Sequence, residues 1–135
     1  MIYYLIYVSD SSNFQNKEEV NEILDTVSIR NNTLNISGFL VFKNGNFLQL
    51  LEGDKAAVIN LFSKIKKDTR HKNVTQILEN ESLNRIFDDY ESGFLVPKNQ
   101  QVLDQLKDHL LYLKLLESPK LNSTIAILEN ILSKM

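Results

Sequence analysis

The sequence predicts an α+β fold in which two helices pack on one face of a single sheet. Three observations support this prediction. Two apolar arms joined by Asn44-Gly45 read as a hairpin over residues 36–53, and a run rich in β-branched and aromatic residues, 2–8, reads as a first strand. Segments with apolar residues at helical spacing, 17–31 and 55–67, precede and follow the hairpin. The length of 135 residues suits one domain with a small appendage.

The hairpin is the central element of the predicted sheet. Asn and Gly tolerate the positive φ angles of a two-residue type I′ turn, so Asn44-Gly45 fixes the register and places Leu40 opposite Gln49. Strand alternation then puts Gln49 on the same side as Phe47 and Leu51. An amide on an otherwise apolar strand face must find hydrogen-bond partners or destabilise the fold.

The remaining elements complete the pattern. Asp54 is placed to cap the second helix, residues 74–79 read as a fourth strand, and residues 92–96 read as a short fifth strand before Pro97. The order β-α-β-β-α-β followed by one more strand is typical of a ferredoxin-like sheet with two helices on one face. We therefore assign residues 1–97 to this domain.

Residues 98–135 are expected to form a C-terminal pair of helices. Leucines recur at helical spacing over 100–116, and Ser118-Pro119 marks the start of a second helix. The pair is expected to cover the bare face of the sheet or a partner subunit.

Composition excludes several classes of protein. A net charge of −2 and a pI near 5.7 argue against a general nucleic-acid binder. The chain has no cysteine, no signal-peptide pattern and no apolar stretch long enough to span a bilayer, so we expect a cytoplasmic protein without membrane partners. Two histidines far apart, and no cysteine, indicate no metal site.

The residues that could carry chemistry are polar groups in or beside the predicted core. Tyr7 on the first strand and Gln49 on the third are expected to be neighbours on parallel central strands. Spacing alone favours a core tyrosine whose hydroxyl is bonded by a core glutamine, with a ligand as the alternative. The polar residues at the two helix ends, over 30–32 and 68–71, are by themselves typical of capping.

Taken together, these residues resemble the BLUF family, the blue-light-using flavin photoreceptor domains, over about residues 2–96. The matching pieces are LIYVS (5–9), RNN (30–32), ISG (36–38), GNFLQLLEG (45–53), DTRH (68–71) and RIF (85–87). The resemblance implies a flavin, usually FAD with FMN or riboflavin as alternatives, bound between the two helices. The implied site residues are Tyr7, Leu24, Ser28, Asn31, Asn32, Gln49, Ile65, Asp68, Arg70 and His71.

The resemblance also implies roles and a photochemical, non-enzymatic mechanism. Tyr7 matches the photoactive tyrosine, Gln49 the switching glutamine, and Asn32 the asparagine that bonds the flavin ring. Arg70 and His71 match the basic pair that lines the pocket. The excited flavin takes an electron from Tyr7, a proton moves through Gln49, and the rotated or tautomerised amide then bonds the flavin C4 carbonyl. A strand reports this change to the surface as a local switch.

The chain departs from the family pattern on the fifth strand. Tyr90 and Ser92 stand where the family usually has Trp and Met, which pass the signal outward. This departure motivates an alternative, a BLUF-derived interaction module with an impaired photocycle or no flavin. A small acylphosphatase-like enzyme is a third reading, without a Gly-rich loop to support it. Since no effector domain follows residue 135, we expect signalling by binding, through homo-oligomers at or near the C-terminal helices and through an unidentified downstream protein.

Overall fold

The computed structural model describes residues 1–12, 17–87, 94–116 and 119–135. These residues form two compact units, Met1–Val96 and Pro97–Met135, and each is described by itself. The first unit holds β1 (Ile2–Ser11), α1 (Lys17–Thr33), β2 (Ser37–Lys43), β3 (Asn46–Gly53), α2 (Lys55–Lys67), β4 (His71–Ser82) and β5 (Phe94–Leu95). The second holds α3 (Gln100–Lys114) and α4 (Pro119–Lys134).

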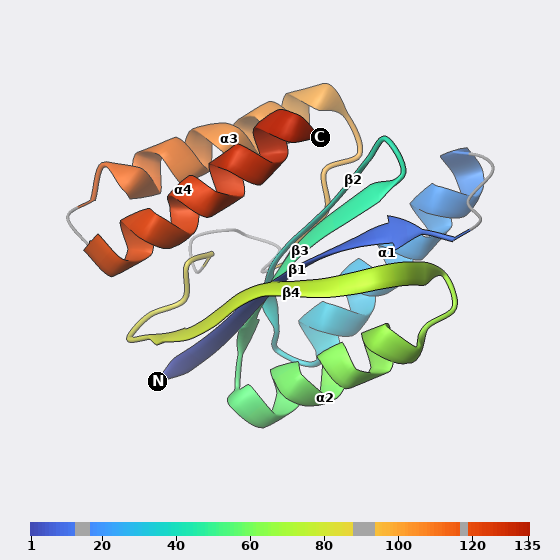
Figure 1. Ribbon diagram of the computed structural model, residues 1–135, viewed down its shortest axis with the longest axis horizontal. Helices are drawn as coiled ribbons and strands as arrows, with labels where there is room; N and C mark the ends of the chain where they lie inside the picture. Colours follow the sequence, from blue (N-terminus) through green and yellow to red (C-terminus); the bar gives the residue numbers. More distant parts are fainter. Residues whose placement is uncertain (13–16, 88–93, 117–118) are drawn as a thin grey trace. The chain divides into compact units, whose positions relative to one another are not determined.

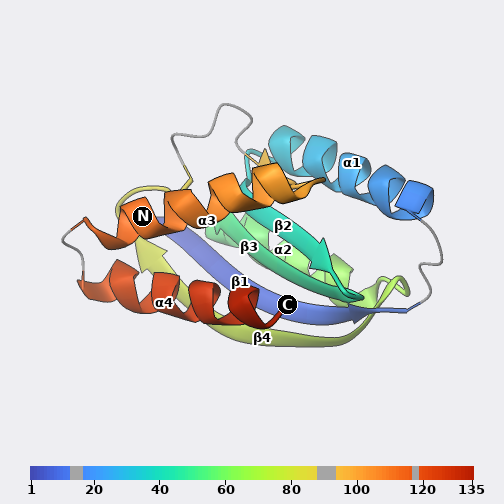
Figure 2. The ribbon, with the colours of Figure 1, turned by 90° about the horizontal axis from the view of Figure 1, so that it is seen from above.

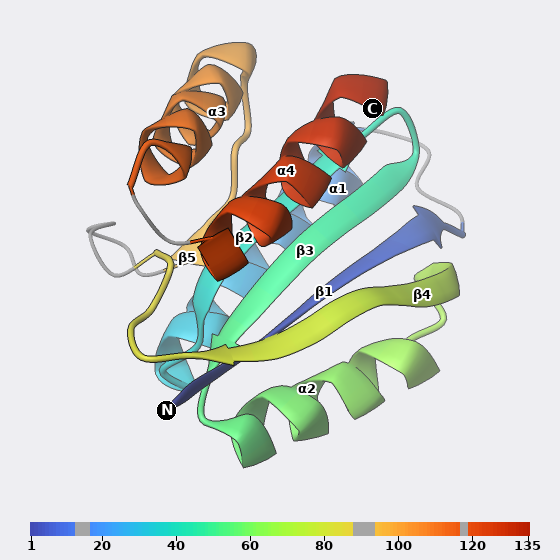
Figure 3. The ribbon, with the colours of Figure 1, turned by 60° about the vertical axis from the view of Figure 1, so that its left-hand side comes forward.

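The five strands form one sheet in the order β4-β1-β3-β2-β5, as Figure 3 shows; the first four strands are also labelled in Figure 1. The central strands β1 and β3 are antiparallel, so the expectation that they run parallel was wrong. The reason is topological. Helix α1 returns the chain so that β2 runs in the same direction as β1, and the tight hairpin then reverses the chain into β3. The predicted ferredoxin-like α+β fold is confirmed.

The hairpin has the register that its turn predicts. Leu40 pairs with Gln49, and the turn residues Asn44 and Gly45 have φ angles of 53° and 80°, as a type I′ turn requires. One glycine in β2 also has a structural reason. Gly38 has a φ of 131°, and a Cβ there would lie 2.0 Å from the carbonyl oxygen of Leu50, so no side chain fits at this position.

Helices α1 and α2 pack on the same face of the sheet (Figure 2). The core between them and the sheet combines side chains from β1, β2, β3, β5 and both helices. Its members include Tyr3, Leu5, Tyr7, Leu24, Val27, Leu40, Phe47, Leu51, Val58, Leu61, Phe62 and Ile65. Asp54 caps α2 as predicted, since its Oδ2 accepts a hydrogen bond of 3.2 Å from the backbone N–H of Ala57.

The boundaries of β4 differ most from the prediction. The strand spans His71–Ser82, whereas the sequence predicts residues 74–79. It lies at one edge of the sheet, and its burial pattern alternates only over Leu78–Ser82. Two register shifts against β1, between Ile6 and Tyr7 and between Val8 and Asp10, explain this pattern. Each inserted residue changes the face on which the following side chains lie, so the period-two pattern breaks and the sequence predicts a strand that is too short.

The second unit is a pair of antiparallel helices (Figures 1 and 2). Asn99 caps α3 through a hydrogen bond of 2.9 Å from the Val102 N–H to its Oδ1. The leucine stripe predicted for α3 is buried, namely Leu103, Leu106, Leu110 and Leu113. Ser118 lies outside the described residues. No helix among the described residues is long and apolar enough to cross a membrane.

Candidate functional site

Tyr7 and Gln49 form the centre of the site. They are paired across the antiparallel ladder of β1 and β3, and both side chains are 1% exposed. The Tyr7 hydroxyl donates a hydrogen bond to Gln49 Oε1. The amide nitrogen, Gln49 Nε2, is buried and has no hydrogen-bond partner among the residues that the structure describes. The predicted phenol–amide pair is therefore present, and it leaves one buried amide donor unused.

The Tyr7 ring sits in largely apolar surroundings. The Phe62 ring from α2 lies 5.3 Å from it between centroids, and the His71 ring lies 6.4 Å away in an edge-on arrangement. Burial raises the pKa of Tyr7, an effect that the charge of Arg30 opposes and that of Asp68 reinforces. Tyr7 therefore remains a protonated phenol at neutral pH and acts as a hydrogen-bond donor.

The C-terminal turn of α1 brings Asn31, not Asn32, into the interior. Asn31 is fully buried, whereas Asn32 is exposed. Arg30 Nε donates a hydrogen bond of 3.2 Å to Asn31 Oδ1, so the amide oxygen is occupied, and Nδ2 is a buried donor to which no described residue offers an acceptor. Of the two predicted asparagines, the structure thus brings only Asn31 into the core beside Arg30, and Asn32 lies at the surface.

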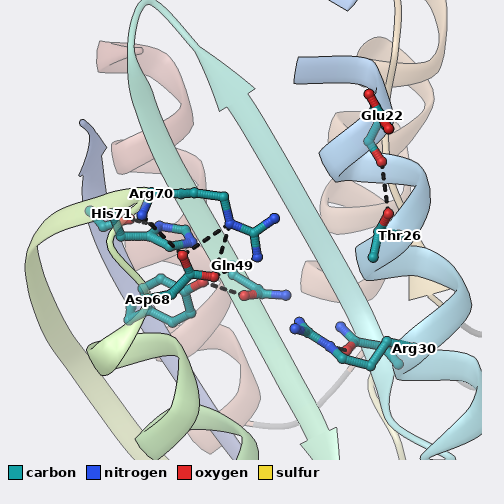
Figure 4. A network of polar contacts seen from close by, with 10 residues as sticks. Glu22, Thr26, Arg30, Gln49, Asp68, Arg70 and His71 are labelled. Atoms are coloured by element: carbon teal, nitrogen blue, oxygen red, sulfur yellow. Dashed lines mark hydrogen bonds and ion pairs between the residues drawn. The ribbon is translucent and has the colours of Figure 1, made fainter. Parts of the chain in front are cut away.

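A bidentate ion pair stands at the end of α2. Arg70 donates from Nε to Asp68 Oδ1 at 2.9 Å and from Nη2 to Asp68 Oδ2 at 2.5 Å. The hydrogen bonds from Arg70 lower the pKa of Asp68 to about 2. Figure 4 shows this pair and Arg30 on opposite sides of Gln49, with Arg30 coming from α1.

His71 begins β4 and is held by two contacts. Its Nδ1 lies 2.9 Å from the buried hydroxyl of Ser9, and its ring packs 4.6 Å from the ring of Phe47. Burial lowers the pKa of His71, and the positive charges of Arg70 and Arg30 act in the same direction while Asp68 opposes them. Sequence analysis assigned no role to Ser9, and only its place within the LIYVS motif marked it.

The other predicted residues divide into three groups. Leu24 and Ile65 are buried in the same core as Tyr7, while Ser28 on α1 is partly exposed. Phe62, which sequence analysis treated only as part of a buried helical stripe, contacts Tyr7 directly. Tyr90 and Ser92 lie outside the described residues.

The two unpartnered donors, Gln49 Nε2 and Asn31 Nδ2, test whether a flavin suits these residues. A flavin ring edge carries carbonyl oxygens, and buried amide N–H groups without partners are what such acceptors require. The two guanidinium groups of Arg30 and Arg70 lie near one carboxylate, that of Asp68, which suits a ligand that carries hydrogen-bond acceptors or negative charge. The donor set therefore fits a flavin. No group of three potential metal ligands occurs among the residues that the structure describes.

Comparison with protein families gives one match that covers most of the first unit. The sequence profile of BLUF, described as sensors of blue light using FAD, matches residues 2–93. Photoactivated adenylate cyclase subunit beta of Euglena longa is 38% identical over 73 residues, which are 54% of this chain and 8% of that protein. The corresponding subunit alpha of Euglena gracilis is 37% identical over 73 residues, 54% of this chain and 7% of that protein. The chain thus spans less than a tenth of these curated relatives.

Solved structures agree with the sequence matches. The structure described as BlrP1 BLUF, a protein known from Klebsiella pneumoniae, superposes with a TM-score of 0.67 at 27% identity, covering 81% of this chain and 76% of that one. A bacterial light-regulated adenylyl cyclase superposes with a TM-score of 0.66 at 27% identity, covering 99% of this chain and 36% of that one.

Proposed function

The chain belongs to the BLUF family of blue-light sensors that use a flavin, and we propose that Tyr7 and Gln49 carry its light response. The hydrogen bond from the Tyr7 hydroxyl to Gln49 Oε1, next to an unused Nε2, is the observation that carries the proposal. When bound, a flavin supplies blue-light absorption and an acceptor for one electron from a neighbouring phenol.

The amide of Gln49 has two arrangements that differ in the face it shows to a ligand. In the arrangement present here, Oε1 accepts a hydrogen bond from the Tyr7 hydroxyl, and Nε2 is left to donate one to a ligand. After rotation by half a turn, Nε2 faces the Tyr7 oxygen and Oε1 faces the ligand, so a new hydrogen bond to a flavin carbonyl requires the imidic-acid tautomer, in which this oxygen carries a proton. A proton lost from the Tyr7 hydroxyl has Gln49 Oε1 as its acceptor, so the same contact serves proton movement and amide rearrangement.

We propose that Asn31, Arg30, Arg70 and His71 hold the flavin together with Gln49. Asn31 offers its unpartnered Nδ2 because Arg30 occupies its Oδ1. Arg70 is oriented by Asp68, which fixes the guanidinium at the end of α2. FAD is the proposed flavin, with FMN and riboflavin as alternatives that share the same ring.

Absorption spectroscopy tests the proposal. Purified protein should show a flavin band that moves to the red under blue light and returns in darkness. Tyr7→Phe should keep the flavin and lose the shift. Tyr3→Phe is a matched control, because Tyr3 lies on the same strand face and its hydroxyl bonds Glu79 rather than Gln49. A normal shift in Tyr7→Phe contradicts the proposal, and a protein that cannot be reconstituted with FAD favours the alternative of an interaction module.

We further propose that the chain senses light without catalysing a reaction, and that it acts in the cytoplasm through protein contacts. The cyclase activity named for the relatives is not carried over, because the match covers 8% of the first of them. Two exposed apolar side chains, Tyr112 on α3 at 57% and its C-cap Leu115 at 76%, support an interface for a second copy or a downstream protein in residues 98–135. Leu115→Glu should lower the oligomeric state in size-exclusion chromatography with light scattering, and an unchanged mass contradicts self-association through this surface.

A further inference from the structure

A second buried polar cluster lies at the end of β3, outside the Tyr7–Gln49 site. Glu52 is fully buried, and its carboxylate accepts hydrogen bonds from the hydroxyl of Ser37 at 2.9 Å and from the backbone N–H groups of Ile86 at 2.6 Å and Phe87 at 2.8 Å. Burial raises the pKa of Glu52, and these hydrogen bonds oppose that effect. A buried carboxylate with this many donors is a built site rather than an incidental contact.

Arg85 completes the cluster. Its Nη1 donates to Ser37 Oγ at 2.7 Å and to the backbone carbonyl of Glu52 at 3.3 Å, and its Nη2 donates to the carbonyl of Asn35 at 2.9 Å. The hydroxyl of Ser37 therefore bridges the Arg85 guanidinium and the Glu52 carboxylate, because it accepts a hydrogen bond from the first and donates one to the second. The cluster joins the start of β2, the end of β3 and the irregular segment Arg85–Phe87 that follows β4.

The segment Arg85–Phe87 depends on this carboxylate for its backbone hydrogen bonding. It is not part of a strand or helix, so a sheet ladder does not hold its N–H groups. Two successive N–H groups bind the two oxygens of one side chain, and the Phe87 ring packs edge-on against Phe39 of β2 at 5.3 Å. Movement at the end of β3 must therefore move this segment or break these bonds.

Glu52 and Gln49 lie three residues apart on the same strand, about 10 Å at the rise of an extended chain, and on opposite faces of the sheet. We propose that Glu52 is a positioning residue that couples β3 to the segment Arg85–Phe87, so that the rearrangement of Gln49 in light changes this segment on the other face. The inference rests on the proposed function of Gln49. It assigns a role to a buried carboxylate that the light reaction itself does not use.

Glu52→Gln breaks the cluster with little change in the shape of the side chain. The carboxylate presents an acceptor oxygen to each of the two N–H groups, whereas an amide has one acceptor and would place an NH₂ donor against the other. Glu81→Gln is the matched control, since Glu81 is an exposed carboxylate on β4.

The test compares hydrogen–deuterium exchange at the amides of Ile86 and Phe87 in the full chain with FAD, in darkness and under blue light. We expect exchange to differ between light and dark in the wild type and in Glu81→Gln. In Glu52→Gln, exchange should be at least tenfold faster in the dark and the ratio of light to dark rates should fall to one, while the red shift of the flavin band persists. A purely structural contact would speed exchange in both states equally and preserve the ratio.

Several results would overturn the inference. One is a wild type whose flavin band shifts while Ile86 and Phe87 do not respond to light; another is a light-to-dark ratio that survives in Glu52→Gln. A wild type without any red shift overturns the proposed function and this inference together. Ser37→Ala serves if Glu52→Gln does not fold, because it removes the hydroxyl link to Arg85 and retains the carboxylate. It should reduce the light-to-dark ratio, and an unchanged ratio counts against the coupling.

Discussion

A double-mutant cycle on Tyr7 and Gln49 would examine the site before any light is applied. Tyr7→Phe removes the hydroxyl that bonds Gln49 Oε1 and keeps the ring against Phe62. Gln49→Leu removes the acceptor of that bond, and it also removes Nε2, a buried donor for which the described part of the chain offers no partner. The two substitutions therefore differ in what they leave unsatisfied, although they break the same hydrogen bond.

The expected magnitudes follow from burial. Leaving one buried polar group without its partner costs about 1–3 kcal/mol, so Tyr7→Phe should lower the free energy of unfolding of the flavin-free protein by about that amount. Gln49→Leu leaves the Tyr7 hydroxyl unpaired, but it also removes Nε2 and with it a similar cost of burying an unpaired donor. Its net effect on the free energy of unfolding should therefore be within about 1 kcal/mol of zero. The double variant has neither partner and should be at least as stable as Tyr7→Phe alone, with a coupling of about 1–3 kcal/mol.

Urea unfolding of the four proteins with and without saturating FAD measures this cycle. With flavin bound, Nε2 has an acceptor, so Gln49→Leu should become destabilising by about 1–3 kcal/mol relative to its effect without flavin. Tyr3→Phe combined with Gln49→Leu is the control, and its effects should add to within about 0.5 kcal/mol. The reasoning is refuted if Tyr7→Phe and Gln49→Leu are also additive, or if flavin leaves the effect of Gln49→Leu unchanged.

Three further predictions concern the binding site and its supports. Asn31→Ala should weaken flavin binding about tenfold through loss of one buried amide donor, while Asn32→Ala should leave it unchanged; fluorescence titration separates the two, and equal losses would contradict the assignment. Asp54→Ala should lower the free energy of unfolding by about 1 kcal/mol because α2 loses its cap, and an unchanged urea midpoint would count against this role. Arg70 lowers the pKa of Asp68 from 3.8 to about 2, so the stability that this pair contributes is present above pH 3.8 and is lost as the pH falls toward 2. Asp68→Asn should remove this loss, which a series of unfolding midpoints measured at different pH values would show.

The parts of the fold that local chemistry determines could be predicted from the sequence. The turn at Asn44-Gly45 needs two residues with positive φ, so it fixed the strand pairing of the hairpin and the face on which Gln49 lies. The cap at Asp54 is also a local interaction. The direction of β1 relative to β3 depends on how α1 returns the chain before the hairpin reverses it, and the residues of the two strands do not determine it, so the prediction of a parallel pair was wrong.

The choice between Asn31 and Asn32 could not be made from the sequence. Both follow Arg30 at the end of α1, and successive helical residues point about 100° apart, so only the placement of α1 on the sheet decides which side chain is buried. The cluster around Glu52 was missed for a related reason. Ser37 and Glu52 meet by strand pairing, but their bonds to Arg85–Phe87 are made across 33 or more residues of chain.

The edge position of β4 has a consequence for how the protein behaves in concentrated solution. A twelve-residue strand with one unpaired side is a template on which strands of other molecules could add. The two register shifts interrupt the flat run of hydrogen-bonding groups, and the exposed charges of Lys72, Glu79 and Glu81 would have to be desolvated by an added strand. The register shifts that break the alternation of β4, where the sequence predicts a strand only over 74–79, thus also make the strand a poorer template for strand addition.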